Sequence, residues 1–284
     1  PMKVTGDRCE IVRDLYFNVP LIAHEVCHYT ALRDFYALKD KFINSGAPLP
    51  WWVDEEIKLI EEKGFKGAFH EMYKASKHFQ FICWKTAYEE MRKSALLGGF
   101  HFLQFADTDV YENSNGVVDC FDDETCVKPD DFLKFNGDRV IIADLGNRNR
   151  YCSDVLIVPI YFSNLGEDTE TSADVAITVE KGGKTYADCS MKTLDVSRKG
   201  VYRLCKAGIT LPDETGVYVL RIRLISDGKL YSENEWTLWV YDKNDKKGSY
   251  GDFVSYDDGK VVITDDIKTA FDALGKGKRV CLVY

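Results

Sequence analysis

The sequence lacks the features that mark several special classes of protein. No apolar run approaches the roughly 18–20 residues that a membrane-crossing helix needs. No block of Lys and Arg is present, and 37 basic against 46 acidic residues leave a formal charge of −9. Such a chain offers no electrostatic footprint for nucleic acid or for an anionic membrane surface. Only 7 prolines and no collagen or coiled-coil period occur, so we expect a globular protein with neither of those partners.

The nine cysteines, from Cys9 to Cys281, lack the spacings that metal sites and disulfide frameworks need. Their number is odd, and no C-x-x-C pair occurs, which disfavours a zinc ribbon and a tight disulfide framework. We expect most of them to be buried or half-buried thiols. Cys152, Cys189 and Cys205 lie in strand-like segments that would allow pairing across a sheet, but the sequence does not specify the connectivity. No cofactor is implied.

The residue patterning divides the chain into three parts. The first part contains short apolar runs and helical patterns, at 19–23 (apolar), 51–63 (helical), 68–93 (helical) and 100–105 (apolar). The second contains short period-two segments, at 140–143, 155–162, 175–179, 201–205, 217–225 and 236–241. Regular short strands with turn signals predict an antiparallel, immunoglobulin-like β-sandwich of roughly 100 residues. The last part reads as strand, helix and strand, at 260–264, 266–274 and 278–284.

We therefore predict three domains, at 1–137, 138–243 and 244–284, with α/β character in the first and last and an all-β fold between them. All five histidines precede the sandwich, so chemistry is sought in the first domain. Its longer helical pattern carries two apolar stripes, one through Met72 and one through Trp84, which predicts packing on two sides.

The stretch 24–28 reads HEVCH and fits the H-E-x-x-H pattern of zinc peptidases. On a helix, His24 and His28 would lie one turn apart and share a zinc ion, with Glu25 as general base for the bound water. Such a site needs a third ligand, and no H-x-x-G-x-x-H continuation follows; Glu55 or Glu56 is an available candidate. A zinc-dependent hydrolase is therefore one alternative.

The competing interpretation places 19–25 on a strand whose carboxyl end presents Glu25 to a cleft. Barrel glycosidases hold a nucleophilic carboxylate at such a strand end. An ionised glutamate needs hydrogen-bond donors nearby, and His24 and His28 would supply them. The second apolar run is followed by a loop rich in carboxylates and amides, beginning with Asp107, and sugar hydroxyls bind to groups of that kind.

From His24 onward the chain resembles the C-terminal half of the catalytic barrel of family 2 glycoside hydrolases, the β-galactosidase-like group. β-Galactosidases show Glu-x-x-His at the end of the seventh barrel strand, and Glu25 and His28 match it. A related bacterial branch shows His-Glu at this point, which His24 and Glu25 match. In that family the glutamate at this position is the nucleophile.

Further matches to the family follow downstream. The eighth strand of the family begins Gly-Gly-Phe, as the chain does at 98–100, and ends in an aromatic and acidic loop that Asp107 matches. Additional matching positions are Gly116, Asp119, Asp123 and 129–132. The Trp-Asp-Trp common in strand eight of β-galactosidases is replaced by Phe-Leu-Gln at 102–104, so galactose specificity does not carry over.

The resemblance implies a fragment of a retaining β-glycosidase, cut at both ends: part of a (β/α)8 barrel, then the sandwich, then the start of an α/β domain. It implies that Glu25 attacks the sugar and that His24, His28, Gln104 and Asp107 contact it. The family's general acid/base follows the fourth barrel strand, for which the chain has no residues, so we expect the isolated fragment to be inactive. A carbohydrate partner and a periplasmic or secreted location are further implications, and a homo-oligomeric full-length enzyme is compatible with them.

A third alternative is not enzymatic: the sandwich would act as a carbohydrate-binding or spacer module. Trp236 and Trp239 lie three apart in a strand and hence on opposite faces, so one of them should fill the core while the other is a candidate sugar platform. The backbone around Glu25 distinguishes the two enzymatic alternatives. An extended chain through 22–24 favours sugar chemistry, and a continuous helix over 21–29 favours zinc.

Overall fold

The computed structural model describes residues 19–94, 97–167, 170–243, 256–257, 261–264 and 266–282. Cys9, the start of the third predicted domain at 244 and the terminal residues 283–284 lie outside these ranges. No helix in the described ranges is long and apolar enough to span a membrane. The eight described cysteines are free thiols; Cys126 and Cys281 are exposed, and the other six are buried or half-buried.

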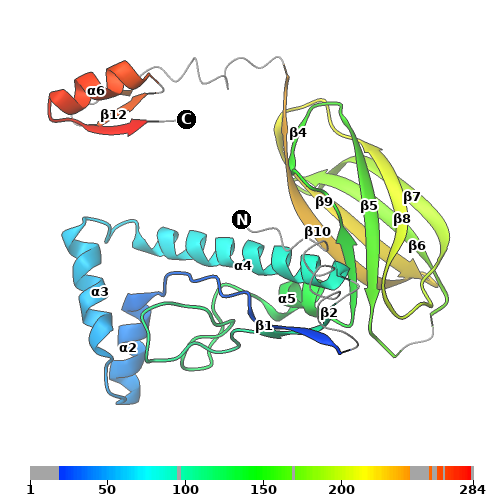
Figure 1. Ribbon diagram of the computed structural model, residues 1–284, viewed down its shortest axis with the longest axis horizontal. Coiled ribbons are helices and arrows are strands. Elements are labelled where there is room, and N and C mark those ends of the chain that lie inside the picture. Colours follow the sequence, from blue (N-terminus) through cyan, green and yellow to red (C-terminus); the bar gives the residue numbers. More distant parts are fainter. Residues whose placement is uncertain are drawn as a thin grey trace.

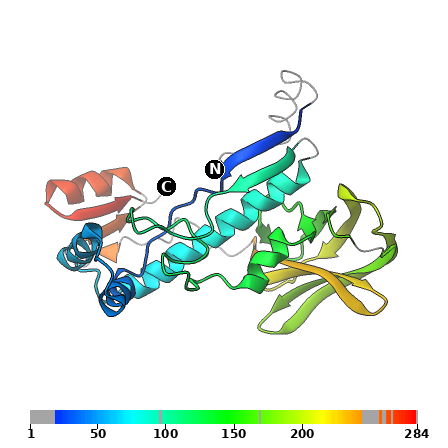
Figure 2. The same ribbon diagram turned by 90° about the horizontal axis from the view of Figure 1, so that it is seen from below.

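The first part of the chain is built on a parallel pair of strands. β1 (Leu21–Val26) and β2 (Leu97–Phe102) pair in parallel and lie side by side next to a long helix (Figures 1 and 2). A parallel pair needs a crossover connection of about a dozen residues or more. Three helices supply it here: α2 (Phe35–Ser45), α3 (Trp51–Glu62) and α4 (Phe69–Lys93). Both predicted strands and both predicted helices are present, although β2 spans 97–102 rather than 100–105.

The sequence analysis missed the helix α2, although local residues explain where it begins and ends. It begins behind Asp34, whose carboxylate accepts a hydrogen bond from Ala37 N at 3.2 Å and thereby caps the first turn. It ends at Gly46, whose φ of 71° lies in the left-handed region that favours glycine. Its buried side chains join those of α3 and the start of α4 in one apolar cluster: Phe35, Leu38, Phe42, Trp52, Val53, Ile60 and Phe69.

The long helix α4 packs against β2 through one of its two predicted apolar stripes. Trp84 and Tyr88 are fully buried, and both rings contact Phe102 of β2, at centroid distances of 5.5 and 5.8 Å. The other predicted stripe is open, because Met72 is 37% exposed and Phe79 is 67% exposed. The stripe through Met72 is therefore not the second packed side of the helix; α4 meets its second neighbour, the sandwich, through Lys85 and Glu89 instead.

The second part is a β-sandwich, as predicted (Figure 1). One sheet has the order β4-β10-β9-β6-β7 and the other has the order β3-β5-β8. The strands are β3 (Arg139–Ala143), β4 (Asn149–Tyr151), β5 (Val155–Asn164), β6 (Ser172–Lys181), β7 (Lys184–Asp195), β8 (Gly200–Thr210), β9 (Gly216–Ser226) and β10 (Lys229–Tyr241). The two inner faces share one apolar core in which Val158, Ile177 and Leu220 are fully buried. Trp236 is 4% exposed and belongs to this core, which confirms that one of the two tryptophans is internal.

Buried polar contacts join α4 to the sandwich. The carboxylate of Glu89 accepts hydrogen bonds from Trp236 Nε1 at 3.0 Å and from Asn234 Nδ2 at 2.9 Å. Lys85 Nζ binds both Glu89 and, at 2.5 Å, Asn234 Oδ1. Burial lowers the pKa of Lys85, and the Glu89 carboxylate opposes that shift. A second helix, α5 (Pro129–Asn136), also lies against the sandwich (Figure 1).

The last part has the predicted order of strand, helix and strand. β12 (Val261–Thr264) and β13 (Arg279–Leu282) pair in parallel, with α6 (Ile267–Gly275) between them. A short strand that was not predicted, β11 (Tyr256–Asp257), pairs antiparallel with β12. The described chain is thus a mixed α/β structure dominated by β-strands. A single parallel pair, β1 and β2, does not close a barrel, so the partial (β/α)8 barrel stays a prediction.

Candidate functional site

Glu25 lies at the end of β1 in a backbone conformation that few residues adopt. β1 follows β2 as far as Ala23, and its register shifts before Val26. Glu25 has a φ of 51° and Cys27 a φ of 68°, both in the left-handed region. Residues other than glycine hold such angles at a cost on the order of 1–3 kcal/mol, and they concentrate at active sites and ligand clamps. The Glu25 side chain is exposed to solvent.

Buried side chains of α4 hold the backbone that follows Glu25. Trp84 Nε1 donates to the carbonyl oxygen of Cys27 at 3.0 Å. Gln80 Nε2 donates to the carbonyl oxygen of Tyr29 at 2.5 Å and to that of Ser114 at 2.7 Å. Because Trp84 and Gln80 are both buried, their positions are set by packing, and they determine the path of the chain after the strand.

The H-E-x-x-H motif does not adopt the helical arrangement that the zinc alternative requires. His24 lies on β1, and His28 lies beyond its end, with the left-handed Glu25 and Cys27 between them. Two imidazoles four residues apart share a face when the segment is a helix, and here it is extended. In the ranges that the structure describes, no group of three or more His, Cys, Asp or Glu side chains could hold a metal ion. The structure therefore contradicts the zinc-peptidase geometry.

The neighbour of His24 is His101 instead of His28. Ala23 pairs with Phe100 across the two parallel strands, so the next residue of each strand is a histidine. The two imidazole rings have centroids 5.1 Å apart and an interplanar angle of 35°. Both side chains are exposed, on the same side of the strand pair as each other. The carboxyl ends of β1 and β2 thus present two imidazoles, one of them adjacent in sequence to Glu25.

Asp107 is a buried carboxylate that orders its own loop. Its Oδ1 accepts hydrogen bonds from Asn115 N at 2.8 Å and Gly116 N at 2.6 Å, and its Oδ2 accepts one from Ser114 Oγ at 2.7 Å. A Cβ at Gly116 would lie 2.4 Å from Asp107 N, so only glycine fits this close approach. No hydrogen bond in the described part of the chain joins Asp107 to Glu25. Both Asp107 oxygens are instead bound within its own loop, and a sugar contact of Asp107 stays a prediction.

The other two predicted sugar contacts are placed near the strand ends without a bond to Glu25. His28 is exposed. Gln104 is half-buried and follows a cis peptide bond after Leu103. Among the described residues, neither forms a hydrogen bond with the Glu25 carboxylate. Their roles as sugar ligands are untested predictions.

Sequence reasoning missed a buried lysine beside Asp107. Lys77 is fully buried, and its Nζ donates to Gln80 Oε1 at 2.6 Å and to Ser114 Oγ at 3.1 Å. Burial lowers its pKa to about 8, against the opposing charge of the Asp107 carboxylate. Lys77 lies seven residues before Trp84, on the buried stripe of α4. That spacing is the signal that could have identified it.

Arg33 is a second buried cation that the sequence analysis missed. Its Nε and Nη2 donate to the carbonyl oxygen of Asn113 at 3.0 and 2.7 Å, and its guanidinium lies 4.9 Å from the ring centroid of Trp52. Its Nη1 is buried and has no hydrogen-bond partner among the described residues. A cavity of about 210 Å³ lies beside it, lined by Arg33, Asp34, Ala37, Leu38, Lys41, Tyr73, Asp107, Ser114, Asp119, Glu124 and Thr125. Glu25 does not line this cavity, so the cavity is not a cleft shared by Glu25 and Asp107.

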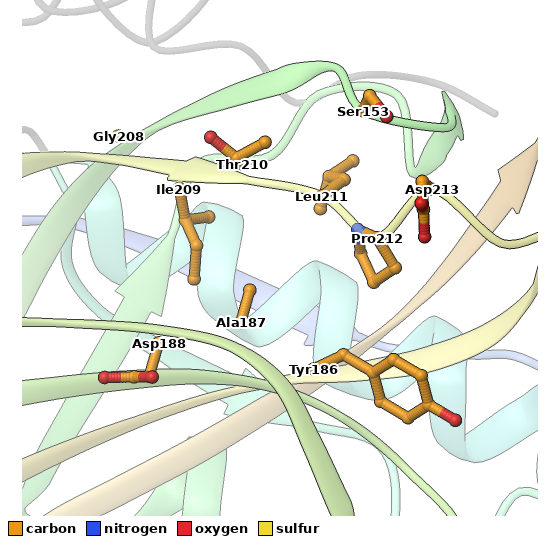
Figure 3. A pocket seen from close by; sticks show the side chains of 10 residues that line it. All are labelled: Ser153, Tyr186, Ala187, Asp188, Gly208, Ile209, Thr210, Leu211, Pro212 and Asp213. Carbon is orange, nitrogen blue, oxygen red and sulfur yellow. The ribbon is translucent and has the colours of Figure 1, made fainter.

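A larger pocket, of about 560 Å³, lies at the open edge of the sandwich between β7 and β8 (Figure 3). Ala187, Ile209 and Pro212 point toward one another in it, while Tyr186 and Asp188 lie along its rim. Its lining contains no histidine, lysine or arginine. Nothing in this pocket resembles a reacting pair of groups.

The sandwich does not present its tryptophans as a sugar platform. Trp236 is buried, and Trp239 is half-buried with the Arg148 guanidinium 6.0 Å from its ring centroid. Tyr151 and Tyr241 are 49% and 47% exposed and lie opposite each other in the pairing of β4 and β10. These side chains do not form a row of exposed aromatic rings on one face of the sandwich. The carbohydrate-binding alternative therefore stays a prediction.

No protein-family model and no curated protein matches the chain. Among solved structures, the β-D-mannosidase of Dictyoglomus thermophilum aligns with 61% of this chain and 20% of that chain, at a TM-score of 0.42 and 15% identity. A β-glucuronidase of Parabacteroides merdae aligns with 30% of this chain and 12% of that chain, at a TM-score of 0.22 and 16% identity. A cohesin module of a family 33 glycoside hydrolase from Clostridium perfringens aligns with 36% of this chain and 96% of that module, at a TM-score of 0.27 and 13% identity. The chain thus spans about a fifth of the mannosidase, and likenesses at these scores carry no functional weight.

Proposed function

We propose that the chain is part of a retaining β-glycosidase in which Glu25 is the nucleophile. The observation that carries the proposal is an exposed carboxylate in a left-handed backbone conformation at the carboxyl end of a parallel strand. Enzymes built on parallel barrels place their reacting groups at that end of the strands. The resemblance to family 2 glycoside hydrolases selects the same residue.

In this proposal the Glu25 carboxylate attacks the anomeric carbon while the bond from that carbon to the leaving oxygen breaks, which forms a covalent glycosyl-enzyme. Water then attacks the same carbon and releases the sugar with net retention. A second carboxyl group about 5–5.5 Å from the first protonates the leaving oxygen and afterwards takes the proton of the water. The family places that residue after its fourth strand, ahead of the part of the barrel that this chain resembles.

The neighbours of Glu25 have different roles in the proposal. The imidazole of His24 and that of His28 would donate hydrogen bonds that keep Glu25 ionised or bind sugar hydroxyls. Gln104 would contact the sugar from the end of the second strand. Asp107 would act indirectly, by ordering the loop after β2, because both its oxygens already accept hydrogen bonds within that loop.

The test replaces Glu25 in a protein that joins this chain to the barrel strands that precede it in the family. Glu25→Ala should lower kcat on nitrophenyl β-glycosides on the order of 10⁴-fold. Added azide should restore part of the turnover and yield the glycosyl azide of inverted configuration, because the small anion takes the place of the lost carboxylate. Glu55→Gln, at an exposed position on α3, is the matched control and should leave kcat unchanged.

Two outcomes would count against the proposal. If Glu25→Ala retains most of the activity, Glu25 is not the nucleophile. If activity is lost but azide yields no inverted product, the residue supports the site without forming the covalent bond. The isolated chain should hydrolyse no glycoside, and turnover by the chain alone that disappears in Glu25→Gln would show that it contains its own acid/base.

A further inference from the structure

At the ends of β1 and β2, His24 lies next to His101, an imidazole that has no role in the proposed glycosidase chemistry. His24 and His101 come from strands far apart in sequence, and the parallel register brings them together. Their ring centroids are 5.1 Å apart, and both rings are open to solvent. Exposed imidazoles have little to hold them in one orientation, since rotation about the terminal side-chain torsion has broad minima.

The separation of the two rings matches the geometry of a shared metal ion. A nitrogen ligand lies about 2.0–2.1 Å from zinc, so the centre of an imidazole ring lies about 3.2 Å from the ion. Two such rings at a tetrahedral angle then have centroids about 5.2 Å apart, and at a right angle about 4.5 Å apart. The observed 5.1 Å falls within that span, so binding would require rotation of the rings but no movement of the strands.

We propose that His24 and His101 form an open, two-histidine binding site for a divalent transition-metal ion of the class that prefers imidazole, namely Ni²⁺, Cu²⁺ or Zn²⁺. Water would complete the coordination, because the described residues contain no third His, Cys, Asp or Glu in a suitable group. Binding would therefore be weaker than at a structural zinc site with four protein ligands. The H-E-x-x-H pattern predicts a site formed by His24 and His28, whereas this site is formed by His24 and His101. The site does not depend on the proposed glycosidase chemistry, because it needs only the two rings.

The chain contains good internal controls. His78 is an exposed histidine on α4 and serves as the matched single-imidazole position. His70 is exposed and lies 3.5 Å from the Asp34 carboxylate. Exposed thiols at Cys126 and Cys281 also bind soft ions and must be separated from the imidazoles.

The experiment titrates the untagged chain with Ni²⁺ and follows the ring signals of its five histidines by NMR. The paramagnetic ion should broaden the signals of His24 and His101 at lower concentration than the other three. His24→Gln and His101→Gln should each weaken the binding measured by calorimetry about tenfold or more, because one of two protein ligands is lost. His78→Gln should leave it unchanged, and Cys126→Ser combined with Cys281→Ser should do so as well.

The proposal is overturned if all five histidine signals broaden together, or if His78→Gln weakens binding as much as His24→Gln does. It is also overturned if the two cysteine substitutions abolish binding. None of these readouts involves glycoside turnover, so failure of the metal site and failure of the proposed function would be seen separately.

Discussion

The strand-and-helix region before residue 138 and the β-sandwich after it (Figure 1) differ in whether they bury charged side chains. In the described residues, the buried charged side chains all lie in the first region: Arg33, Lys77, Glu89 and Asp107. The buried polar side chains of the sandwich are neutral: Ser163, Asn164, Ser226, Ser232 and Asn234. Burying a charge costs free energy unless it is paired and hydrogen-bonded. The first region thus contains buried charges that cost free energy, whereas the described core of the sandwich contains none.

That difference reflects what the buried side chains of each region hold in place. The sandwich core consists of alternating apolar residues from two sheets, and such a core depends on volume and pattern alone. In the first region, Lys77 and Asp107 order the loop after β2, and α4 holds the backbone beside Glu25. Glu89 lies where α4 meets the sandwich, and its carboxylate accepts hydrogen bonds from Trp236 and Asn234.

The largest expected effect comes from breaking the charged contact between the two regions. Glu89→Ala should lower the free energy of unfolding by about 3–5 kcal/mol, because it leaves the largely buried Lys85 ammonium without its counter-charge and Trp236 Nε1 without its acceptor. Urea denaturation followed by tryptophan fluorescence measures the change. The control is Glu71→Ala at an exposed position of the same helix, which should stay within about 0.5 kcal/mol of the parent. Replacing Lys85 and Glu89 together by Met should recover much of the loss, and a double variant as unstable as Glu89→Ala would contradict this account.

The buried Lys77 should make stability depend on pH in a defined direction. Its pKa of about 8 in the folded protein lies below the ordinary lysine value, so the cost of the buried charge is fully present below pH 8. Between pH 8 and about 10.4 the unfolded chain binds more protons, and this lysine should raise the free energy of unfolding by about 3 kcal/mol across the window.

The measurement is the difference between the parent chain and Lys77→Met at several pH values, since other titrating groups cancel in that difference. The advantage of the methionine variant over the parent should shrink as the pH rises from 8 to 10.4. Lys192→Met, at an exposed lysine of the sandwich, should show no such trend. An equally flat difference for Lys77→Met would mean that its hydrogen bonds offset the cost of burial.

The smallest expected effect concerns backbone strain at Glu25. Glu25→Gly should raise the free energy of unfolding by about 0.5–1 kcal/mol, because glycine adopts a φ of 51° without a Cβ penalty. Glu25→Ala keeps the Cβ and should show no gain. Asp227→Gly, at a φ of 46° in a hairpin turn of the sandwich, should gain less, since aspartate tolerates this conformation better than glutamate. Thermal denaturation of the three variants tests the order, and a gain in Glu25→Ala equal to that in Glu25→Gly would show that the strain lies elsewhere.

Local sequence patterns predicted most elements, and those that they missed include β4, β7 and α2. The period-two segments correspond to six strands of the sandwich, from β3 to β10. β4 has only three residues and β7 alternates weakly between exposed and half-buried residues, so neither shows a clear period-two apolar pattern. The helix α2 was missed although Asp34, Phe35, Leu38 and Phe42 have capping and helical spacing.

The candidate site was predicted only in part, because its geometry depends on contacts that are distant in sequence. The position of Glu25 at a strand end follows from the apolar run before it. The backbone that follows Glu25 is held by Trp84 and Gln80, which lie more than 50 residues further along the chain. The motif indicated His28 as the partner of His24, and the register of two parallel strands provides His101 instead.

By itself the sequence determined most of the strands and helices, the change from a mixed region to a β-sandwich, and the residue types available near Glu25. Hydrophobic periodicity and turn residues act over a few positions, so these properties are readable without coordinates. Only the tertiary structure decided that Asp107 is turned into its own loop, that Lys77 is buried beside it and that two imidazoles meet at the strand ends. Such contacts form only when segments distant in sequence pack together. The free energy that favours this packing comes from many native contacts that support one another across the core.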